Sequence, residues 1–315
     1  MPASAASVSS LTISIITPSF NYERFIVDCL DSVRLQVADE VAVQHVVIDD
    51  GSCDRSWEVI CAQHEGASTD RVRQDNVGLA ATLNRALEQV TGEWVLWLNA
   101  DDFLLPQTLE RFARAISEVP DAKLIFGDTL FVDDAARVVR LVAQPSFKRA
   151  LFEGGYNSFH VPSVLWSREL LGEGRLDESM KLLMDLDLWL RLTPPGTVVA
   201  KIDAPLAAFR RHTGQTSASS RPSDAQEMRS LARRHGMQGL LAASSSAPLP
   251  SARVRHGLLK LQEGAWLREL HVMSHRGERV DWMRGGAEVA QALVAPTPRI
   301  RRSVSQGSRR SATSA

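Results

Sequence analysis

Long hydrophobic runs are missing from this 315-residue sequence. No apolar stretch approaches the roughly 20 residues that a helix needs to cross a bilayer, so nothing in the sequence predicts a membrane span. The first ten residues, MPASAASVSS, have neither a cationic start nor an apolar core. We therefore interpret 1–10 as a disordered leader and not as a secretory signal.

Cysteine is scarce, and its three residues show no metal-ligand spacing: Cys29, Cys53 and Cys61. An odd, unpatterned set fits reduced thiols in the cytoplasm better than a disulfide framework. Net charge is equally small at −1, which gives no whole-molecule reason to expect a nucleic-acid partner.

The charge is nevertheless uneven, because 296–315 carries five arginines and no acid. We interpret this segment as a basic disordered tail. Such a tail would be attracted to anionic lipid, which predicts peripheral contact with the inner face of a membrane. The alternative is a solvated end with no partner.

Three short apolar runs, each ended by polar residues, are the most informative feature of the chain: ISIITPSFN at 13–21, HVVIDDGSCD at 45–54 and WVLWLNADD at 94–102. Their length and β-branched content are typical of buried parallel strands. In open α/β sheets, ligands bind beyond the carboxyl ends of such strands. We therefore expect one pocket rim to contain the residues Thr17, Asp50, Asp101 and Asp102. Carboxylates gathered there suit a divalent cation and a nucleotide.

Strand-like and helix-like segments alternate from 11 to about 130, which predicts a doubly wound α/β sheet. Asn21 is placed to cap the first helix, and Pro106 to occupy the first position of a later one. Further along, the patterns predict a hairpin at 122–145, a helix at 182–192, a strand pair made of TVVAKI and PLAAFRRH, and helices beyond about 224. The predicted units are the leader 1–10, a main domain 11–235, a helical extension 236–295 and the tail 296–315.

Six segments occur in the order seen in family 2 glycosyltransferases, and over roughly 11–215 the chain resembles that family: TPSFN, VIDDGSCD, NVGLAATLNRAL, GEWVLWLNADD, LDESMKLLMDLDLWLRL and FRRH. The resemblance implies the GT-A fold, a Rossmann-like, mostly parallel sheet flanked by helices. It also implies inverting transfer of a sugar from a nucleotide diphosphate sugar to a glycan or lipid-linked glycan acceptor, with Mg²⁺ or Mn²⁺. Assembly of a surface polysaccharide or another glycoconjugate is the process we expect.

By similarity, the nucleotide-sugar site comprises Thr17, Pro18, Asn21, Asp49, Asp50, Asn76, Gly78, Asn99, Ala100, Arg210 and His212. A fixed carboxylate such as Asp50 can accept the N–H donors of a base, and a guanidinium suits phosphate oxygens. A helix amino end after Gly78 favours anions. Simpler interpretations stay open: Asp49 and Asp50 as helix caps, Asn76 to Gly78 as a plain turn, and Arg210 to His212 as a surface charge cluster.

The resemblance assigns the metal to Asp101, with Asp102 as a possible water-mediated helper. A hard cation held by one or two carboxylates can neutralise charge that builds on a diphosphate leaving group. The family's Asp-x-Asp site here begins with Asn99, which offers a carbonyl oxygen in place of a charge. Capping of the following helix is the alternative role for Asp102.

The resemblance makes Asp185 the predicted catalytic base, because the family's Glu-Asp pair is here Met184–Asp185. In LMDLDLWLRL it lies at helical spacing from three apolar residues, Leu188, Trp189 and Leu192, whereas Asp187 falls on another face. A carboxyl group on an apolar helix side must face a pocket or be paired. The alternative interpretation is a helix cap.

Two other functions compete with glycosyl transfer. A catalytically silent nucleotide- or glycan-binding protein is suggested by Asn99 and by Met184, which stands where the family has Glu. A sugar nucleotidyltransferase is disfavoured, because no Gly-rich loop bearing Arg or Lys follows the first strand.

Overall fold

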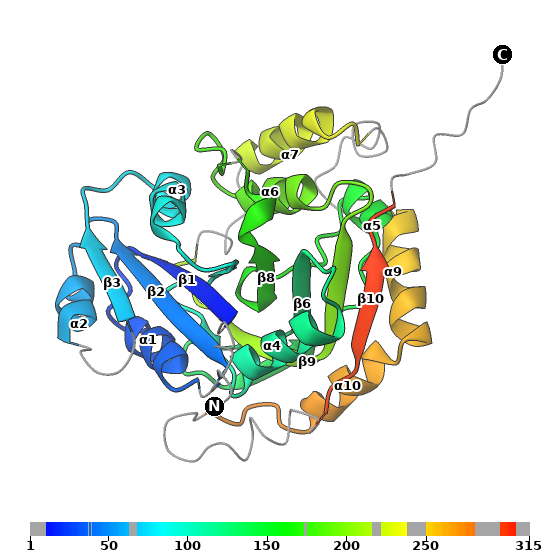
Figure 1. The fold of residues 1–315 in the computed structure, drawn as a ribbon, viewed down its shortest axis with the longest axis horizontal. Coiled ribbons are helices and arrows are strands. Elements are labelled where there is room, and N and C mark those ends of the chain that lie inside the picture. The colour runs from blue at the N-terminus through cyan, green and yellow to red at the C-terminus, as the bar shows by residue number, and fades with distance from the viewer. Residues whose placement is uncertain are drawn as a thin grey trace, which may run out of the picture.

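The computed structural model describes residues 11–36, 38, 40–62, 68–172, 175–215, 222–237, 250–280 and 297–306. Helices flank one large sheet (Figure 1). Its strands are β1 (Leu11–Ser19), β2 (Val41–Asp49), β3 (Ser68–Arg73), β4 (Trp94–Trp97), β5 (Phe103–Leu104), β6 (Leu124–Val132), β7 (Val138–Val142), β8 (Val164–Ser167), β9 (Val198–Arg210) and β10 (Ile300–Val304). The helices are α1 (Ile26–Arg34), α2 (Ser56–Ala62), α3 (Leu79–Gln89), α4 (Thr108–Glu118), α5 (Arg149–Glu153), α6 (Met184–Leu192), α7 (Pro222–Arg234), α9 (Pro250–Gln262) and α10 (Ala265–Met273), with 3-10 turns η1 (Val161–Ser163) and η2 (Arg168–Leu170).

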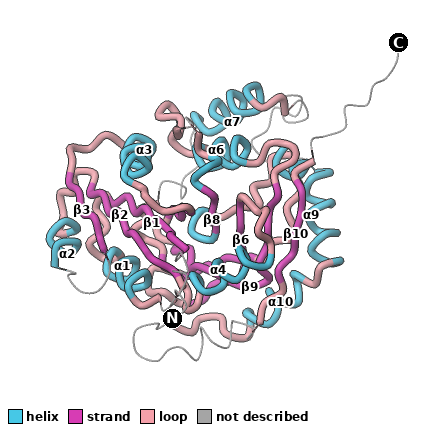
Figure 2. Tube along the Cα trace, viewed as in Figure 1, coloured by secondary structure: helices cyan, strands magenta, loops and turns pink. Residues whose placement is uncertain are grey.

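The sheet confirms the expected α/β fold with a mostly parallel sheet (Figure 2). Its strand order is β10-β9-β6-β8-β4-β1-β2-β3. Strands β3, β2, β1, β4, β6 and β9 run in one direction, and β8 and β10 run against them. The carboxyl ends of β1, β2, β4 and β9 therefore lie at one edge of the sheet.

Two apolar layers cover the sheet. Helices α1, α2 and α4 bury residues such as Cys29, Ile60 and Phe112 on one face. Helices α3, α6 and α7 bury residues such as Leu83 and Trp189 on the other. Both layers are nearly free of solvent, so the strand-end edge is held between two rigid cores.

Several local predictions need correction. The strand pair expected at TVVAKI and PLAAFRRH is the single strand β9, because an irregular register opposite Asp128 lets the sheet accommodate Pro205, which has no N–H to donate. Asn21 does not cap α1: it adopts a left-handed φ of 60°, and α1 starts at Ile26. Pro106 precedes the residue that caps α4, which begins at Thr108.

The prediction of a disordered tail is wrong for Ile300–Val304, which forms β10. This strand pairs antiparallel with β9 at the edge of the sheet. Its charge is neutralised by acids from distant segments, since Arg301 binds Asp203 and Arg302 binds Asp121. Residues 1–10 and 307–315 lie outside the described residues, so the remaining tail and the leader stay predictions.

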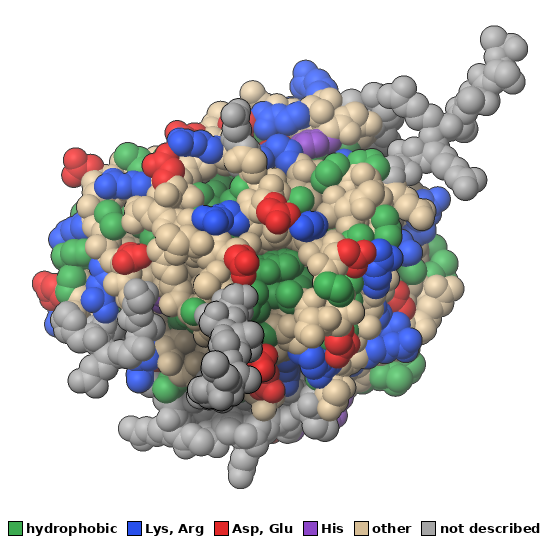
Figure 3. Space-filling view, in the orientation of Figure 1, with side chains coloured by type: hydrophobic (Ala, Val, Ile, Leu, Met, Phe, Trp, Pro, Cys, Tyr) green, Lys and Arg blue, Asp and Glu red, His purple; other side chains and the backbone are tan. Residues whose placement is uncertain are grey.

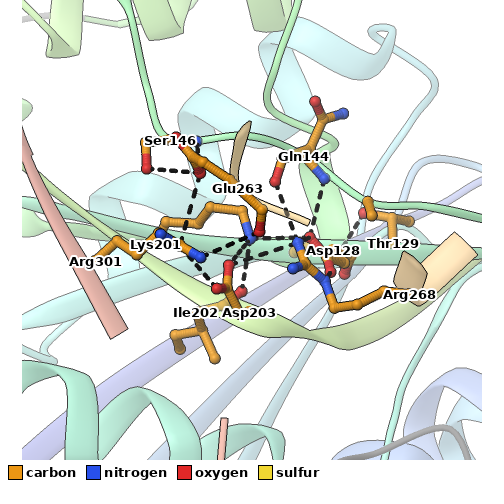
Figure 4. A network of polar contacts seen from close by, with 12 residues as sticks. Asp128, Thr129, Gln144, Ser146, Lys201, Ile202, Asp203, Glu263, Arg268 and Arg301 are labelled. Atoms are coloured by element: carbon orange, nitrogen blue, oxygen red, sulfur yellow. Dashed lines mark hydrogen bonds and ion pairs between the residues drawn. The ribbon is translucent and has the colours of Figure 1, made fainter. Parts of the chain in front are cut away.

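A buried ionic network joins the C-terminal helices to the sheet (Figure 4). Lys201 of β9, with no exposed surface, lies 3.1 Å from Asp128 of β6 and 2.6 Å from Asp203. Arg268 of α10 binds both carboxylates, and Arg301 of β10 binds that of Asp203. Helices α9 and α10 and strand β10 are therefore held against the main domain. No helix in the described ranges is long and apolar enough to cross a membrane.

Candidate functional site

Asp101 and His212 meet at the carboxyl edge of the sheet, although 111 positions separate them. Asp101 follows β4 and His212 follows β9, and these strands run in the same direction. The Asp101 carboxylate lies 3.1 Å from the His212 Nε2 atom and also accepts a hydrogen bond from the Tyr22 hydroxyl. The rings of Tyr22 and Phe25 pack against the imidazole, with centroids 6.0 and 4.8 Å away. The predicted strand-end residues thus form a compact carboxylate–imidazole pair.

Arg210 does not occupy the position expected of a phosphate ligand. Its side chain is 2% exposed, and its guanidinium donates to the Asp101 and Asp134 carbonyls and to the Asp28 carboxylate. It also lies over the Phe25 ring at 4.8 Å. Because its donors face protein groups, Arg210 ties β9 to the loop that carries Asp101.

Asp102 is a structural residue in this arrangement. Its carboxylate is fully buried and accepts the Arg210 backbone N–H at 2.9 Å. Burial, together with the neighbouring Asp101 charge, raises the pKa of Asp102 well above its usual range, which disfavours a charged metal helper. Asn99 donates weakly to Asp102, while its own side-chain oxygen accepts from the Trp97 indole at 2.7 Å. Ala100 between them is buried.

Asp50 fixes the loop that leads into α3. Its carboxylate accepts the backbone N–H groups of Val77 and Gly78, both at 2.9 Å, and the Gln74 amide at 2.8 Å. The Asn76 side chain donates to the Asp50 carbonyl. Asp50, Asn76 and Gly78 thus form one unit, in which Gly78 has a left-handed φ of 89°.

Three other predicted nucleotide contacts face the protein interior. Asp49 is buried and accepts from the Ser52 hydroxyl and from Arg73. The Thr17 hydroxyl is buried against His45 at 2.9 Å. Pro18 is also buried. In this structure these three side chains therefore contact the protein and do not face a ligand.

Asn21, in contrast, is exposed beside the same edge. Its side-chain oxygen accepts the Cys53 N–H at 2.8 Å, and its own N–H donates to Ser52. These bonds join the loop after β1 to the loop after β2. Asn21 therefore shapes the rim of the candidate nucleotide site.

Asp185 lies in the first turn of α6, where Asn157 holds it. The Asn157 side chain donates to the carboxylate at 3.2 Å, and the Leu186 N–H donates at 2.7 Å. Burial is the larger effect and raises the pKa of Asp185 to about 6. A carboxylate with this pKa can accept a proton near neutral pH.

Asp187, two positions on, is buried more deeply than the helical phase suggested. It accepts from Arg191, Arg234 and His235, at 2.8, 3.1 and 2.8 Å. Although burial acts in the opposite direction, these bonds lower the pKa of Asp187 to about 2. Asp187 is thus a structural ion-pair centre that joins α6 to α7.

The donor set can be tested against the expected metal. Among the described residues, no group of three or more His, Cys, Asp or Glu side chains could hold an ion. Asp101 and His212 supply two adjoining ligands of oxygen and nitrogen type. Mg²⁺ and Mn²⁺ commonly take one or two protein ligands and complete their shells with water and substrate phosphates. The pair therefore fits a cation that binds together with a diphosphate.

Sequence reasoning missed two residues of this site. Tyr22, which binds Asp101, stands beside the TPSFN motif and is one of only two tyrosines in the chain. Asn157, which orients Asp185, lies in the loop-rich GGYNSFHVPS segment. Motif matching did not single them out, since their roles depend on contacts with residues 79 and 28 positions away.

Comparison with known proteins agrees with this geometry. The family model described as Glycosyl transferase family 2 matches residues 14–164. A PGL/p-HBAD biosynthesis glycosyltransferase of Mycobacterium tuberculosis is 33% identical over 120 residues, covering 37% of this chain and 46% of the relative. An uncharacterized glycosyltransferase of Haemophilus influenzae is 26% identical over 231 residues, covering 71% and 76%. The matches span about half the length of the first curated relatives, 49% and 46%.

Among solved structures, S. aureus TarS 1-349 in complex with UDP-GlcNAc has a TM-score of 0.58 at 22% identity. The match covers 71% of this chain and 66% of that one, and it shows that the two share a fold. The match over 14–164 and the curated glycosyltransferase relatives support a family 2 glycosyltransferase.

Proposed function

We propose that the protein transfers a sugar from a nucleotide diphosphate sugar to an acceptor hydroxyl, with inversion at the anomeric carbon. Its setting would be cytoplasmic assembly of a surface polysaccharide or another glycoconjugate. The observation that carries the proposal is the meeting of Asp101 and His212 at the carboxyl edge of the sheet. Names of relatives support the biosynthetic role.

Asp101 and His212 would hold Mg²⁺ or Mn²⁺. When bound, such an ion neutralises the charge that develops on the diphosphate leaving group. Tyr22 would orient the Asp101 carboxylate through its hydroxyl, and Arg210 would fix the Asp101 backbone. Asp102 would have no direct role in metal binding, because its carboxylate accepts the backbone N–H of Arg210 in β9.

Asp185 would act as the general base. It takes the proton of the acceptor hydroxyl while the acceptor oxygen bonds to the anomeric carbon, and the bond from that carbon to the diphosphate oxygen breaks with its electron pair. Asn157 keeps the Asp185 carboxylate in place during this step. The raised pKa of Asp185 suits proton uptake near pH 7.

Asp50 and the 76–78 loop would form the nucleoside end of the site. The carboxylate is already bonded to two backbone N–H groups, so the loop is set before a donor arrives. Uridine is the first base to test, because a TarS structure of the same fold holds UDP-GlcNAc.

A thermal-shift screen tests donor and metal together. Diphosphates of uridine, guanosine, thymidine and cytidine would be added with and without Mg²⁺ or Mn²⁺. A ligand at 100 times its dissociation constant adds about 2.7 kcal/mol to the free energy of unfolding. We expect one base to raise the melting temperature, and metal to enlarge the effect in the unaltered protein but not in Asp101→Ala.

The control is Asp134→Ala, which removes an exposed carboxylate that pairs with Arg24. It should behave as the unaltered protein does. Equal nucleotide shifts with and without metal would overturn the cation site. A silent binding protein, suggested by Asn99 and Met184, would show the shifts but no turnover of any donor.

A further inference from the structure

The strongest unassigned feature is an apolar surface on the two C-terminal helices. Successive helix residues are 100° apart, so the exposed residues Val254, Leu258 and Leu261 share one stripe of α9. On α10 the corresponding stripe is made of Trp266, Leu267, Leu270 and Met273. Each of these seven side chains is between 40 and 62% exposed. We call these seven residues the α9–α10 face.

Seven large apolar side chains on two adjoining helices are more than a monomer scatters by chance over its surface. The inner sides of both helices are committed to the domain through Ala252, Ala265 and Val272, which are buried. Burying the outer stripes against the same domain would require the helices to turn over. The α9–α10 face is therefore presented outward by the fold.

Basic residues surround this face, and among the described residues no ion pair neutralises their charges. Arg253 and Arg255 flank the α9 stripe on its two sides, and Arg276 follows α10. None of the three makes an ion pair within the described part of the chain. Figure 3 shows hydrophobic and basic side chains side by side at the right-hand edge, over α9 and α10.

The acidic residues near the face already contact other side chains. Glu263 accepts from Ser146, Glu269 pairs with Lys260, and Glu278 contacts His275. Glu278 has an imidazole and not a fixed cation as its partner, so three arginines against this one carboxylate leave the charge around the apolar stripes net positive. An apolar stripe with a tryptophan and flanking arginines is the pattern of a helix that lies in the interface of an anionic bilayer.

We propose that the α9–α10 face docks on an anionic lipid surface. The apolar side chains enter the boundary between headgroups and acyl chains, while Arg253, Arg255 and Arg276 contact the lipid phosphates. A second copy fits less well, because a two-fold interface would bring the arginine-flanked face of one copy against the same face of the other. The expected basic tail contributes less, since Arg301 and Arg302 are paired within the protein.

Sedimentation of the full chain with vesicles tests the proposal. Phosphatidylcholine vesicles would be compared with vesicles that also contain phosphatidylglycerol. We expect binding to the anionic vesicles, weakened by salt. The double variant Arg253→Gln with Arg255→Gln should lower the partition coefficient roughly 30-fold, because each arginine near the surface contributes about 1 kcal/mol.

Matched controls separate docking from general charge or misfolding. Arg229→Gln with Arg233→Gln removes two exposed arginines from α7 and should leave binding unchanged. Trp266→Ser with Leu270→Ser should reduce binding, whereas Leu35→Ser, at a residue of similar exposure just after α1, should not. Circular dichroism melts would confirm that every variant folds.

Four results would overturn the proposal. The first is an absence of binding to either vesicle, and the second is an equal loss of binding in the α7 and α9 variants. The third is a concentration-dependent dimer in light scattering that Trp266→Ser with Leu270→Ser dissociates, because that would assign the face to a second copy. Retained binding in both α9 and α10 variants would equally exclude this face.

Discussion

Single residues divide into those whose role the sequence could predict and those whose role depends on distant partners. Helical spacing and the family's base position predict the role of Asp185, and a place after a strand and the family's Asp-x-Asp site predict that of Asp101. Arg210 was assigned to phosphate by similarity to the family. Its contacts with Asp28, Asp101 and Asp134 were not predictable, because no local pattern connects these residues to it.

Replacing the proposed base is the sharpest test at this scale. Asp185→Asn keeps the size and one acceptor oxygen for the Leu186 N–H, but it loses the second acceptor that faces Asn157 and removes basicity. Transfer should fall by roughly 10²–10⁴-fold, with donor affinity unchanged, as measured by steady-state kinetics and nucleotide titration. Asp187→Asn would be a poor control because Asp187 centres an ion network, so Glu118→Gln on α4 is preferred. Joint loss of donor binding and transfer would make Asp185 a structural residue.

The pH dependence of Asp185 gives a second prediction. With a pKa of about 6, this carboxyl group is protonated in acid and cannot accept the acceptor proton. The value of kcat/KM should therefore rise with pH through about 6 and then level off. A profile that is flat from about pH 5 to about pH 8 would exclude Asp185 as the titrating base.

The free energy of unfolding should change with pH in the opposite direction to kcat/KM. The folded pKa of Asp185 lies above the unfolded value of 3.8, so the unfolded chain loses its proton first as pH rises. The free energy of unfolding should fall between about pH 4 and about pH 6, by up to about 3 kcal/mol from this group. Asp185→Asn removes that loss and should be more stable than the unaltered protein at pH 7, in a urea titration. A less stable variant would contradict the assigned environment.

At the scale of elements, the strands that end at the site were predictable and the edge of the sheet was not. The runs that became β1, β2 and β4 carry their own apolar pattern. The sequence of β10 has no such pattern. Its arginines, Arg302 and Arg301, are neutralised by Asp121 and Asp203, which lie 181 and 98 positions away in the sequence. β9 was split in the prediction because no local pattern shows that β9 continues past Pro205 through an irregular register with β6.

The network between β6, β9 and α10 predicts how firmly the C-terminal helices are held. Lys201→Met removes the fully buried cation that contacts both Asp128 and Asp203. Breaking such a pair costs about 3–5 kcal/mol, measurable by urea unfolding. Arg302→Ala, which removes an exposed pair with Asp121, should cost no more than about 1 kcal/mol. Equal costs for the two variants would show that the buried network does not stabilise the fold.

At the scale of the whole molecule, the sheet joins three groups that the sequence presents separately. The Asp50 loop, the Asp101–His212 pair and the C-terminal helices all attach to strands of one sheet. Fold class was predictable because the strand-helix alternation is local. The link between His212 and Asp101 was not, since it depends on β9 running parallel to β4.

Nucleoside diphosphate release from a donor sugar, with and without Mg²⁺ or Mn²⁺, tests the central claim most directly. We predict release by the unaltered protein that depends on metal, no metal stimulation in Asp101→Ala, and donor binding without transfer in Asp185→Asn. Donor binding without release in the unaltered protein, across all four bases and both metals, would contradict the account and leave a nucleotide-binding protein.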